Sequence, residues 1–283
     1  MAEGHAVARW AVALRALVRE RLEAVDATTR WKERAAELPG ERVTGVDTHG
    51  NHLMIRVSGG WTIHCHAMQY GSWQVGPPGQ ELRKERRYIR LRLLTKRHEA
   101  VYYHGPVMEI LTDAEAAEHP KLDALGPDLL AEPFDRKEAR RRLAEASGRE
   151  IGDAILDQRI VSGIGNIFKS EGLFLAGIDP RRDAATVGEA ELDRLWDGLV
   201  PIMREGVGRY GPTITLPEEL RGDGGEGGRG DRNWVYRRRG RPCLRCGETV
   251  ERIRQGDLGR ATFYCPRCQA SRPLRSSTTS SRT

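Results

Sequence analysis

Two cysteine pairs near the end of the chain constrain its folding more than any other feature. Cys243 and Cys246 form one Cys-x-x-Cys pair, and Cys265 and Cys268 form a second pair after eighteen intervening residues. At this spacing four thiolates can occupy the corners of a tetrahedron, the geometry of a closed structural zinc site. We therefore predict a zinc ribbon holding one Zn²⁺, with paired disulfides as the less favoured alternative. Only Cys65 is left over, which favours a reducing compartment.

The segment around these cysteines is rich in arginine. Nine arginines lie between positions 237 and 267, and such a density favours phosphate groups as the partner. Residues 248–254 and 260–265 alternate in polarity as two strands would, with 255–259 as the connecting turn. Arg260 then lies near the tip of a hairpin, where it could enter a DNA groove. The alternative is a solvated turn residue.

Length and composition limit the number of domains and the class of partner. The 283 residues are enough for two domains and a small appendage, and a net charge of +6 with a pI near 9.2 favours an anionic partner. Forty acidic residues show that the basic charge is patterned. The chain has no run of eighteen apolar residues, so we expect no membrane span. We expect a cytoplasmic, nucleoid-associated monomer.

In the first third of the chain the spacing of apolar residues changes from a helical to a strand pattern. Apolar residues from Val7 to Val25 recur at helical spacing, and a polar helical extension is predicted for residues 23–37. Six short segments with period-two alternation follow, at residues 42–46, 53–57, 61–67, 88–94, 100–103 and 107–111. They predict a β-sandwich or barrel on which the first helix packs.

Two histidines on one predicted strand invite a metal interpretation. His64 and His66 flank Cys65, and strand alternation puts both on the face opposite Cys65. We interpret them as ordinary strand residues, with a metal site as the less favoured alternative. The basic run at residues 83–92 is likewise interpreted as a loop and a half-exposed strand, with a DNA-facing role as the alternative.

From residue 113 onward the pattern is helical. Asp135 is placed to cap a helix over residues 136–146. Residues 151–174 predict two helices joined by the turn 163–166, in which glycines permit close approach and Asn166 could direct helix amides at a phosphate. A further amphipathic helix is predicted for residues 188–210.

These patterns together predict an α+β multidomain chain. We expect an N-terminal β-sandwich with a long helix, a helical domain and a C-terminal zinc ribbon. The predicted boundaries are 1–118 for the sandwich, 119–215 for the helical domain, 216–232 for a Gly-rich linker, 233–270 for the ribbon and 271–283 for a disordered tail.

Several motifs carry a resemblance to a known family. They are Met1-Ala-Glu-Gly4 before a helix, residues 66–73, the helix-two-turn-helix with Asp157, Gln158, residues 163–166 and Glu171, and the ribbon ending at residues 259–265. Together they resemble the formamidopyrimidine-DNA glycosylase and endonuclease VIII family, over residues 1 to about 270. Residues 101–130 are more similar to the endonuclease VIII branch, which the resemblance associates with oxidised pyrimidines.

The resemblance implies a base-excision-repair enzyme that flips a damaged nucleotide out of duplex DNA and removes the base. It makes Gln69 and Tyr70 the candidates that fill the vacated space, although many relatives have Met where this chain has Gln69. Asn166 and Arg260 would hold the phosphates beside the lesion, and Glu3 would be the acid that protonates the sugar ring oxygen or moves protons during attack at C1′.

Two residues depart from the family pattern at positions that take part in the reaction. The family attacks C1′ with an N-terminal proline, exposed once Met1 is removed, and this chain has Ala2 there. Asn51 replaces the lysine that reaches the phosphate at the site. A free Ala2 amine with a pKa near ~8 is still a usable nucleophile, so base excision could survive while strand cleavage weakens.

Two other functions remain open from the sequence. One is a lesion- or abasic-site-binding protein without catalysis, which the paired loss of proline and lysine favours. The other is a zinc-ribbon DNA-binding protein without lesion preference, which leaves the N-terminal motif and residues 163–166 unexplained.

Overall fold

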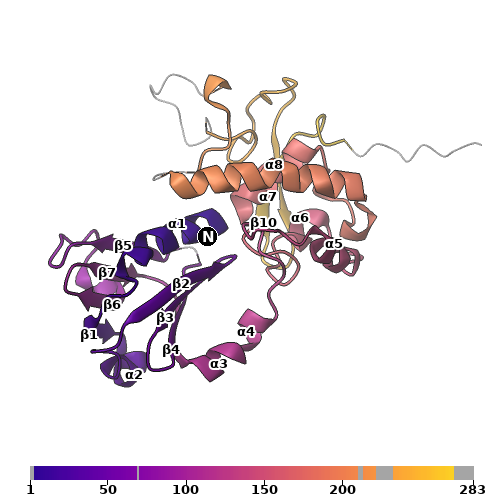
Figure 1. The fold of residues 1–283 in the computed structure, drawn as a ribbon. Coiled ribbons are helices and arrows are strands. Elements are labelled where there is room, and N and C mark those ends of the chain that lie inside the picture. Colours follow the sequence, from indigo (N-terminus) through magenta and orange to yellow (C-terminus); the bar gives the residue numbers. More distant parts are fainter. Residues whose placement is uncertain (1–2, 69, 210–212, 221–231, 271–283) are drawn as a thin grey trace, which may run out of the picture.

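The structure is a computed structural model that describes residues 3–68, 70–209, 213–220 and 232–270. Figure 1 shows a stranded N-terminal half and a helical C-terminal half, joined by the short helices α3 (Asp113–Ala117) and α4 (Pro120–Asp123). The α+β architecture predicted from the sequence is confirmed. Within the described residues no helix is both long and apolar enough to cross a membrane.

The N-terminal half is a sandwich of two four-stranded antiparallel sheets. One has the order β1-β6-β7-β5 and the other β2-β3-β4-β8. The strands are β1 Leu22–Ala27, β2 Val43–His49, β3 His52–Val57, β4 Trp61–His66, β5 Ser72–Gly76, β6 Ile89–Thr95, β7 Glu99–Tyr103 and β8 Val107–Thr112. Helix α1 (Gly4–Leu14) buries Val7, Ala11 and Leu14 in the core between the sheets.

The prediction of one helical stretch from residue 7 to residue 37 is wrong in part. Helix α1 ends at Leu14, and after a 3₁₀ turn at Arg15–Leu17 the backbone enters the left-handed region at Arg19 (φ 71°). Residues 22–27 then form β1, which pairs with β6. Leu17 and Leu22 are buried in the same core, so their spacing agrees with a helix only by coincidence. Pairing with β6 overrides the local periodicity.

The polar extension contains less helix than predicted, and a second strand besides β1 was missed. Only α2 (Lys32–Ala36) is α-helical there, after a 3₁₀ turn at Thr29–Trp31. Strand β5 was not predicted, although it pairs along its whole length with β7. A further 3₁₀ turn, Arg86–Tyr88, leads into β6.

The C-terminal half is built on two helices packed on each other. α7 (Asn166–Ala176) and α8 (Glu189–Gly208) pack together, with α5 (Arg136–Ala144) and α6 (Ile151–Ala154) beside them and a 3₁₀ turn at Ala184–Thr186. Asp135 caps α5 as predicted, accepting from the Glu138 amide at 2.9 Å. Of the span predicted as two helices, the first is only the short α6.

The ribbon hairpin packs on α7. Strands β9 (Glu251–Gln255) and β10 (Arg260–Tyr264) pair as predicted, and the Phe263 amide donates to Ser170 Oγ at 3.2 Å. Residues 218–220 of the predicted linker form a 3₁₀ turn. The rest of the Gly-rich run and the tail 271–283 lie outside the described residues.

Candidate active site and nucleic-acid interface

Glycines bring the two halves into backbone contact. The Gly4 amide donates to the Gly163 carbonyl at 2.8 Å, and a Cβ added to Gly4 would lie 2.9 Å from Gly163 Cα. The Gly50 amide donates to Asp128 Oδ2 at 3.0 Å. Gly163 itself has φ +100°, a conformation that side chains rarely adopt. The glycines of the turn thus serve the close approach predicted from the sequence.

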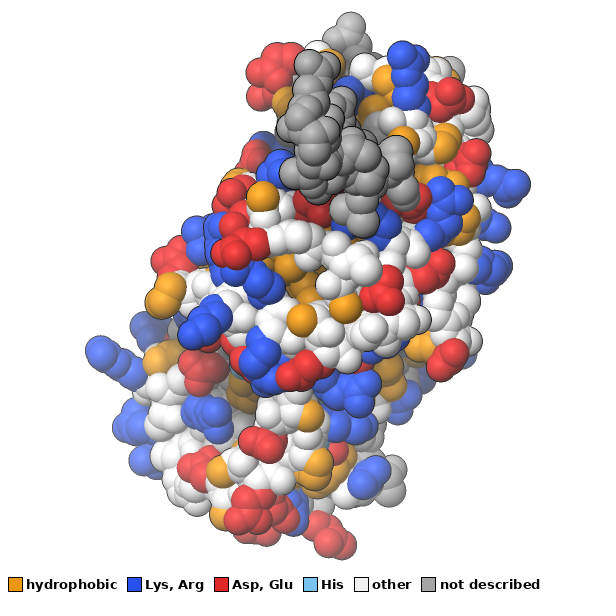
Figure 2. Space-filling model, turned by 90° about the vertical axis from the view of Figure 1, so that its right-hand side faces the viewer, with side chains coloured by type: hydrophobic (Ala, Val, Ile, Leu, Met, Phe, Trp, Pro, Cys, Tyr) orange, Lys and Arg blue, Asp and Glu red, His pale blue; other side chains and the backbone are white. Residues whose placement is uncertain are grey.

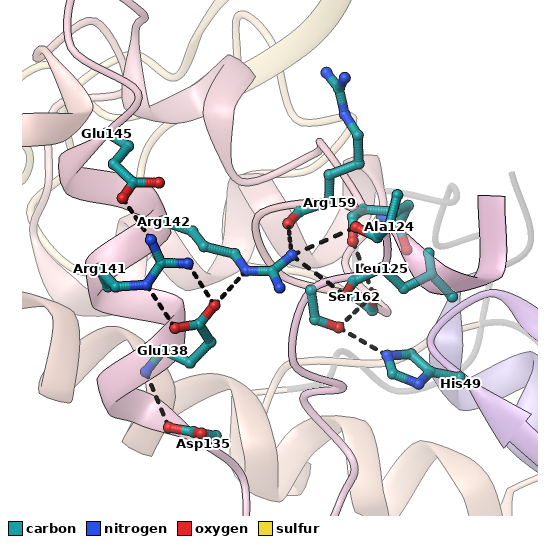
Figure 3. A network of polar contacts seen from close by, with 12 residues as sticks. His49, Ala124, Leu125, Asp135, Glu138, Arg141, Arg142, Glu145, Arg159 and Ser162 are labelled. Atoms are coloured by element: carbon teal, nitrogen blue, oxygen red, sulfur yellow. Dashed lines mark hydrogen bonds and ion pairs between the residues drawn. The ribbon is translucent and has the colours of Figure 1, made fainter. Parts of the chain in front are cut away.

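Side chains hold this turn from within the helical half. Gln158 accepts from the Gly163 amide at 2.9 Å and donates to the Ile164 carbonyl at 3.0 Å. Ser162 Oγ donates to the Gly126 carbonyl at 3.0 Å, and His49 Nε2 of β2 lies 2.7 Å from the same oxygen. Figure 3 shows His49 reaching from the sandwich toward the segment of Ser162, so the sandwich contributes to the support of the turn.

Arg142 of helix α5 supports the loops that lead to this turn. The Arg142 guanidinium donates to the carbonyls of Arg159, Leu125 and Ala124, and its Nε donates to Glu138 at 2.7 Å (Figure 3). Three carbonyls from two loops therefore converge on one planar cation. This fixes the loop that precedes the turn 163–166.

Glu3 is the central side chain at the junction. It is 3% exposed, and its two carboxylate oxygens accept from the amides of Ile167 at 2.7 Å and Phe168 at 3.1 Å. A carboxylate from the sandwich thus caps the N-terminus of α7. Burial outweighs these hydrogen bonds and raises the pKa of Glu3 to about 7. A carboxyl with this pKa can give and take a proton near neutrality.

Lys169 of α7, which the sequence analysis did not single out, lies within electrostatic range of Glu3. It is fully buried on α7, and its Nζ has no hydrogen-bond partner among the described residues. Burial lowers its pKa to about 8, while the charges of Asp153 and Glu3 oppose that shift. In the sequence, Lys169 stands at helical spacing from the apolar Leu173 and Ala176. A lysine on an apolar helix face was the signal by which it could have been found.

The four ribbon cysteines converge. Sγ atoms lie 3.9 Å apart for Cys243 and Cys268 and 3.5 Å apart for Cys246 and Cys265, and all four lie within 4.8 Å of one another. Tetrahedral zinc with bonds of about 2.3 Å requires sulfur separations of roughly 3.8 Å. The donor set therefore fits one structural zinc, as predicted.

Glu171 joins the ribbon to the helical half. It is fully buried, and its carboxylate accepts from the amides of Trp234 at 2.8 Å, Val235 at 2.9 Å and Tyr236 at 2.8 Å. Thr215 donates a short hydrogen bond to the same group. The motif glutamate therefore positions the ribbon relative to α7.

The comparisons with known proteins agree with this arrangement. Residues 1–107 match the formamidopyrimidine-DNA glycosylase N-terminal domain, residues 125–218 match the corresponding H2TH domain, and residues 240–270 match a zinc finger found in FPG and IleRS. A probable endonuclease 8 2 of Streptomyces coelicolor is 39% identical over 237 residues, covering 83% of this chain and 81% of that protein. The chain belongs to the formamidopyrimidine-DNA glycosylase and endonuclease 8 family. It is a base-excision-repair DNA glycosylase with the family's three-part organisation.

Other similar proteins come from both branches of the family. Endonuclease 8 of Klebsiella pneumoniae strain 342 is 33% identical, covering 82% of this chain and 85% of that protein. Formamidopyrimidine-DNA glycosylase of Desulfitobacterium hafniense DCB-2 is 31% identical, covering 81% and 82%. The fold matches Lactococcus lactis Fpg bound to abasic-site DNA with a TM-score of 0.76 at 22% identity, over 95% of this chain and all of that one.

The predicted void-filling segment lies on the surface of this glycosylase. Tyr70 is 70% exposed and Met68 is 40% exposed, with Met68 in the left-handed region (φ 46°). Gln69 lies outside the described residues, as does Ala2. Met68 was not singled out from the sequence, and it supplies an exposed apolar side chain next to Gln69.

Asn51 and Asn166 have different surroundings. Asn51 is 1% exposed beside Trp10 and Trp73, and both of its amide atoms lack partners among the described residues. Asn166 begins α7, but the amides of Ile167 and Phe168 are occupied by Glu3. The amides of Ile167 and Phe168 are therefore not free to bind a phosphate, whereas a phosphate contact by Asn166 itself stays a prediction.

Arg260 lies at the start of β10, opposite Gln255, and is half-buried. Its charge contributes to lowering the pKa of Lys169. The ribbon therefore brings Arg260 toward the pocket of Glu3 and Lys169. Figure 2 shows that Lys and Arg on the face it draws are interspersed with Asp and Glu. On α5, for example, Arg136 pairs with Asp197 at 2.6 Å.

Proposed function

We propose that this glycosylase removes an oxidised pyrimidine and that the amine of Ala2 attacks C1′ after Met1 is cleaved. The observation that carries the proposal is the buried Glu3 carboxyl, held one residue from Ala2 by two helix amides. Its pKa of about 7 lets it donate a proton to the sugar ring oxygen at neutral pH. The relatives named endonuclease 8 support the endonuclease VIII type of activity.

The proposed reaction proceeds through a primary amine. The neutral amine forms a bond to C1′, the glycosidic bond breaks, and the base leaves with the bonding electron pair. The nitrogen then loses one proton, the C1′–O4′ bond breaks as Glu3 protonates O4′, and the nitrogen lone pair forms a protonated imine with C1′. Loss of the remaining N–H proton gives the neutral imine. This imine accepts electrons for strand cleavage only when protonated, whereas proline would give a permanently cationic iminium. We therefore propose efficient base release and weak strand cleavage.

Lys169 supports the site where the family lysine is absent. Asn51 carries no charge and is buried, whereas Lys169 places an unpaired ammonium close to Glu3. We propose that its charge helps to keep Glu3 titrating near neutrality and attracts the phosphate of a bound lesion. We further propose that the enzyme acts as a cytoplasmic monomer on damaged DNA.

Trapping on lesion DNA tests the nucleophile. Borohydride should yield a covalent adduct on an abasic-site duplex, and peptide mass analysis should place it on Ala2. A residue added ahead of Ala2 should abolish the adduct, because it moves the amine away from the sugar. Ala2→Pro should increase strand nicking relative to base release. No adduct and no base release across a panel of lesions, with lesion-selective binding intact, would favour the non-catalytic binding protein.

A further inference from the structure

A cluster of histidines and one glutamate lies on the sandwich, away from Glu3 and the ribbon. His64 of β4 and Glu109 of β8 are paired in register, and His64 Nδ1 lies 2.8 Å from Glu109 Oε2. His119, the residue before α4, brings its Nε2 to 3.2 Å from the same oxygen. One ligand atom from each of the three residues thus lies within 4.8 Å of the others.

The geometry points to a second metal site at His64, Glu109 and His119, which we propose binds a divalent transition metal of the zinc class. Two imidazole nitrogens and one carboxylate oxygen are typical zinc ligands, and water would complete the tetrahedron. Bonds of about 2.0–2.2 Å require ligand atoms roughly 3.3 Å apart. The two separations from Glu109 Oε2, 2.8 Å and 3.2 Å, are close to this value.

A second layer of residues orients His64 for this role. His52 Nδ1 lies 2.9 Å from His64 Nε2, and the ring of His52 stacks on that of His66 with centroids 4.4 Å apart. When Nδ1 of His64 binds metal, its proton is on Nε2 and donates to His52. Metal-binding histidines usually have such an outer partner, which fixes the ring and its tautomer.

Burial and access also fit a metal site. His64 is 1% exposed, while Glu109 and His119 are 25% and 15% exposed, so an ion can enter from the solvent side. His119 Nδ1 has no hydrogen-bond partner among the described residues, so only His64 has such an outer partner.

The site would join parts of the chain with different roles. His64 and Glu109 belong to the sheet, whereas His119 belongs to the connection that leads through α3 and α4 to the helical half (Figure 1). A bound ion would therefore fasten this connection to the sheet. It would stabilise one placement of the helical half relative to the sandwich, independently of the glycosylase chemistry.

Metal analysis of the full chain tests the site. After equilibration with excess Zn²⁺ and desalting, the wild type should retain two zinc ions per chain, and Glu109→Gln and His119→Gln should retain one. His104→Gln, a half-buried histidine outside the cluster, should retain two and is the matched control. Substituting Co²⁺ should add a weak spectrum without thiolate charge-transfer bands, and Glu109→Gln should remove it.

Hydrogen exchange gives a readout independent of stoichiometry. At Zn²⁺ about ten times its dissociation constant, opening of residues 113–123 should slow roughly tenfold in the wild type and not in His119→Gln. One zinc per chain in the wild type, with exchange of residues 113–123 unaffected by Zn²⁺, would overturn the proposal. Circular dichroism of both variants would show whether the sheet remains folded.

Discussion

At the scale of single residues, the burial of Glu3 sets its pKa and so its proposed role as an acid. Its pKa is raised to about 7 because it is buried, although two amides stabilise the charged form. Ionising Glu3 in the folded chain is therefore unfavourable. Its contribution to stability is fully present below its unfolded pKa near 4.5 and is lost as the pH rises through about 7. The same burial that costs stability at alkaline pH provides an acid at neutral pH.

This predicts a bell-shaped pH profile for base release. The Ala2 amine must be neutral, with a pKa near ~8, and Glu3 must be protonated, so kcat/KM should be highest between about 7 and about 8. Glu3→Gln should lower the rate by ~10²–10⁴ and remove the alkaline limb, leaving a rate that rises to a plateau. Single-turnover base release across pH 5–10 measures both. An unchanged alkaline limb in Glu3→Gln would contradict the assigned acid.

Lys169 supplies a control for this profile. Its positive charge favours ionised Glu3, so Lys169→Met should move the alkaline limb to higher pH, and Lys169→Arg should leave it close to the wild type. A lysine with only a packing role would change stability in both variants without moving the limb. The two substitutions therefore separate electrostatic support from packing.

At the scale of elements, the contact between the β2–β3 turn and the helix-two-turn-helix turn determines whether the pocket forms. Gly50 has φ +56°, and a Cβ there would lie 2.5 Å from Ser162 Cβ and 2.8 Å from the Gly163 amide nitrogen. The space between the two turns is therefore too small for any side chain. The capping of α7 by Glu3 depends on this approach.

Gly50→Ala should consequently lower activity more than a matched glycine substitution. Gly79 has φ +74°, and a Cβ there would have nothing within 4 Å. Both substitutions carry the strain of a left-handed alanine, roughly 1–2 kcal/mol, and only Gly50→Ala adds the clash with the other half. We expect base release to fall at least tenfold further in Gly50→Ala than in Gly79→Ala. Equal base-release rates in the two variants, at equal stability, would mean that the contact between the two turns is not needed for activity.

At the scale of the whole molecule, α7 contacts both the ribbon, through β10, and the N-terminal half, through Glu3. Glu171 binds three consecutive ribbon amides, and Arg260 acts electrostatically on Lys169. The zinc site therefore has a function beyond folding the ribbon, since it helps to place Arg260 near the pocket. Binding of DNA should reflect this placement.

Salt dependence of DNA affinity tests that role. If Arg260 neutralises one phosphate, Arg260→Ala should reduce the slope of log affinity against log salt by about 0.9. Arg136→Ala is the matched control, because Arg136 already pairs with Asp193 and Asp197 and its loss should leave the slope unchanged. Binding to abasic-site duplex should also weaken more than binding to undamaged duplex. Equal losses on both duplexes would make Arg260 a general phosphate contact.

The sequence by itself determined the features that depend on local spacing. The four cysteines, the six predicted strands, the cap at Asp135 and the glycine turn at residues 163–166 follow from covalent geometry and short-range periodicity, and the structure has each of them. The family motifs also singled out Glu3, whose catalytic role stays a prediction. The domain boundaries remain predictions.

Tertiary structure decided what depends on partners distant in the chain. Residues 22–27 have helical spacing but form a strand because β6 offers a partner. Lys169 becomes a buried charge beside Glu3 only when the two halves pack, since burial and Coulomb interactions depend on neighbours and not on spacing. The same holds for His64 of β4, Glu109 of β8 and His119 before α4, which meet because β8 pairs with β4 and α3 packs against both strands.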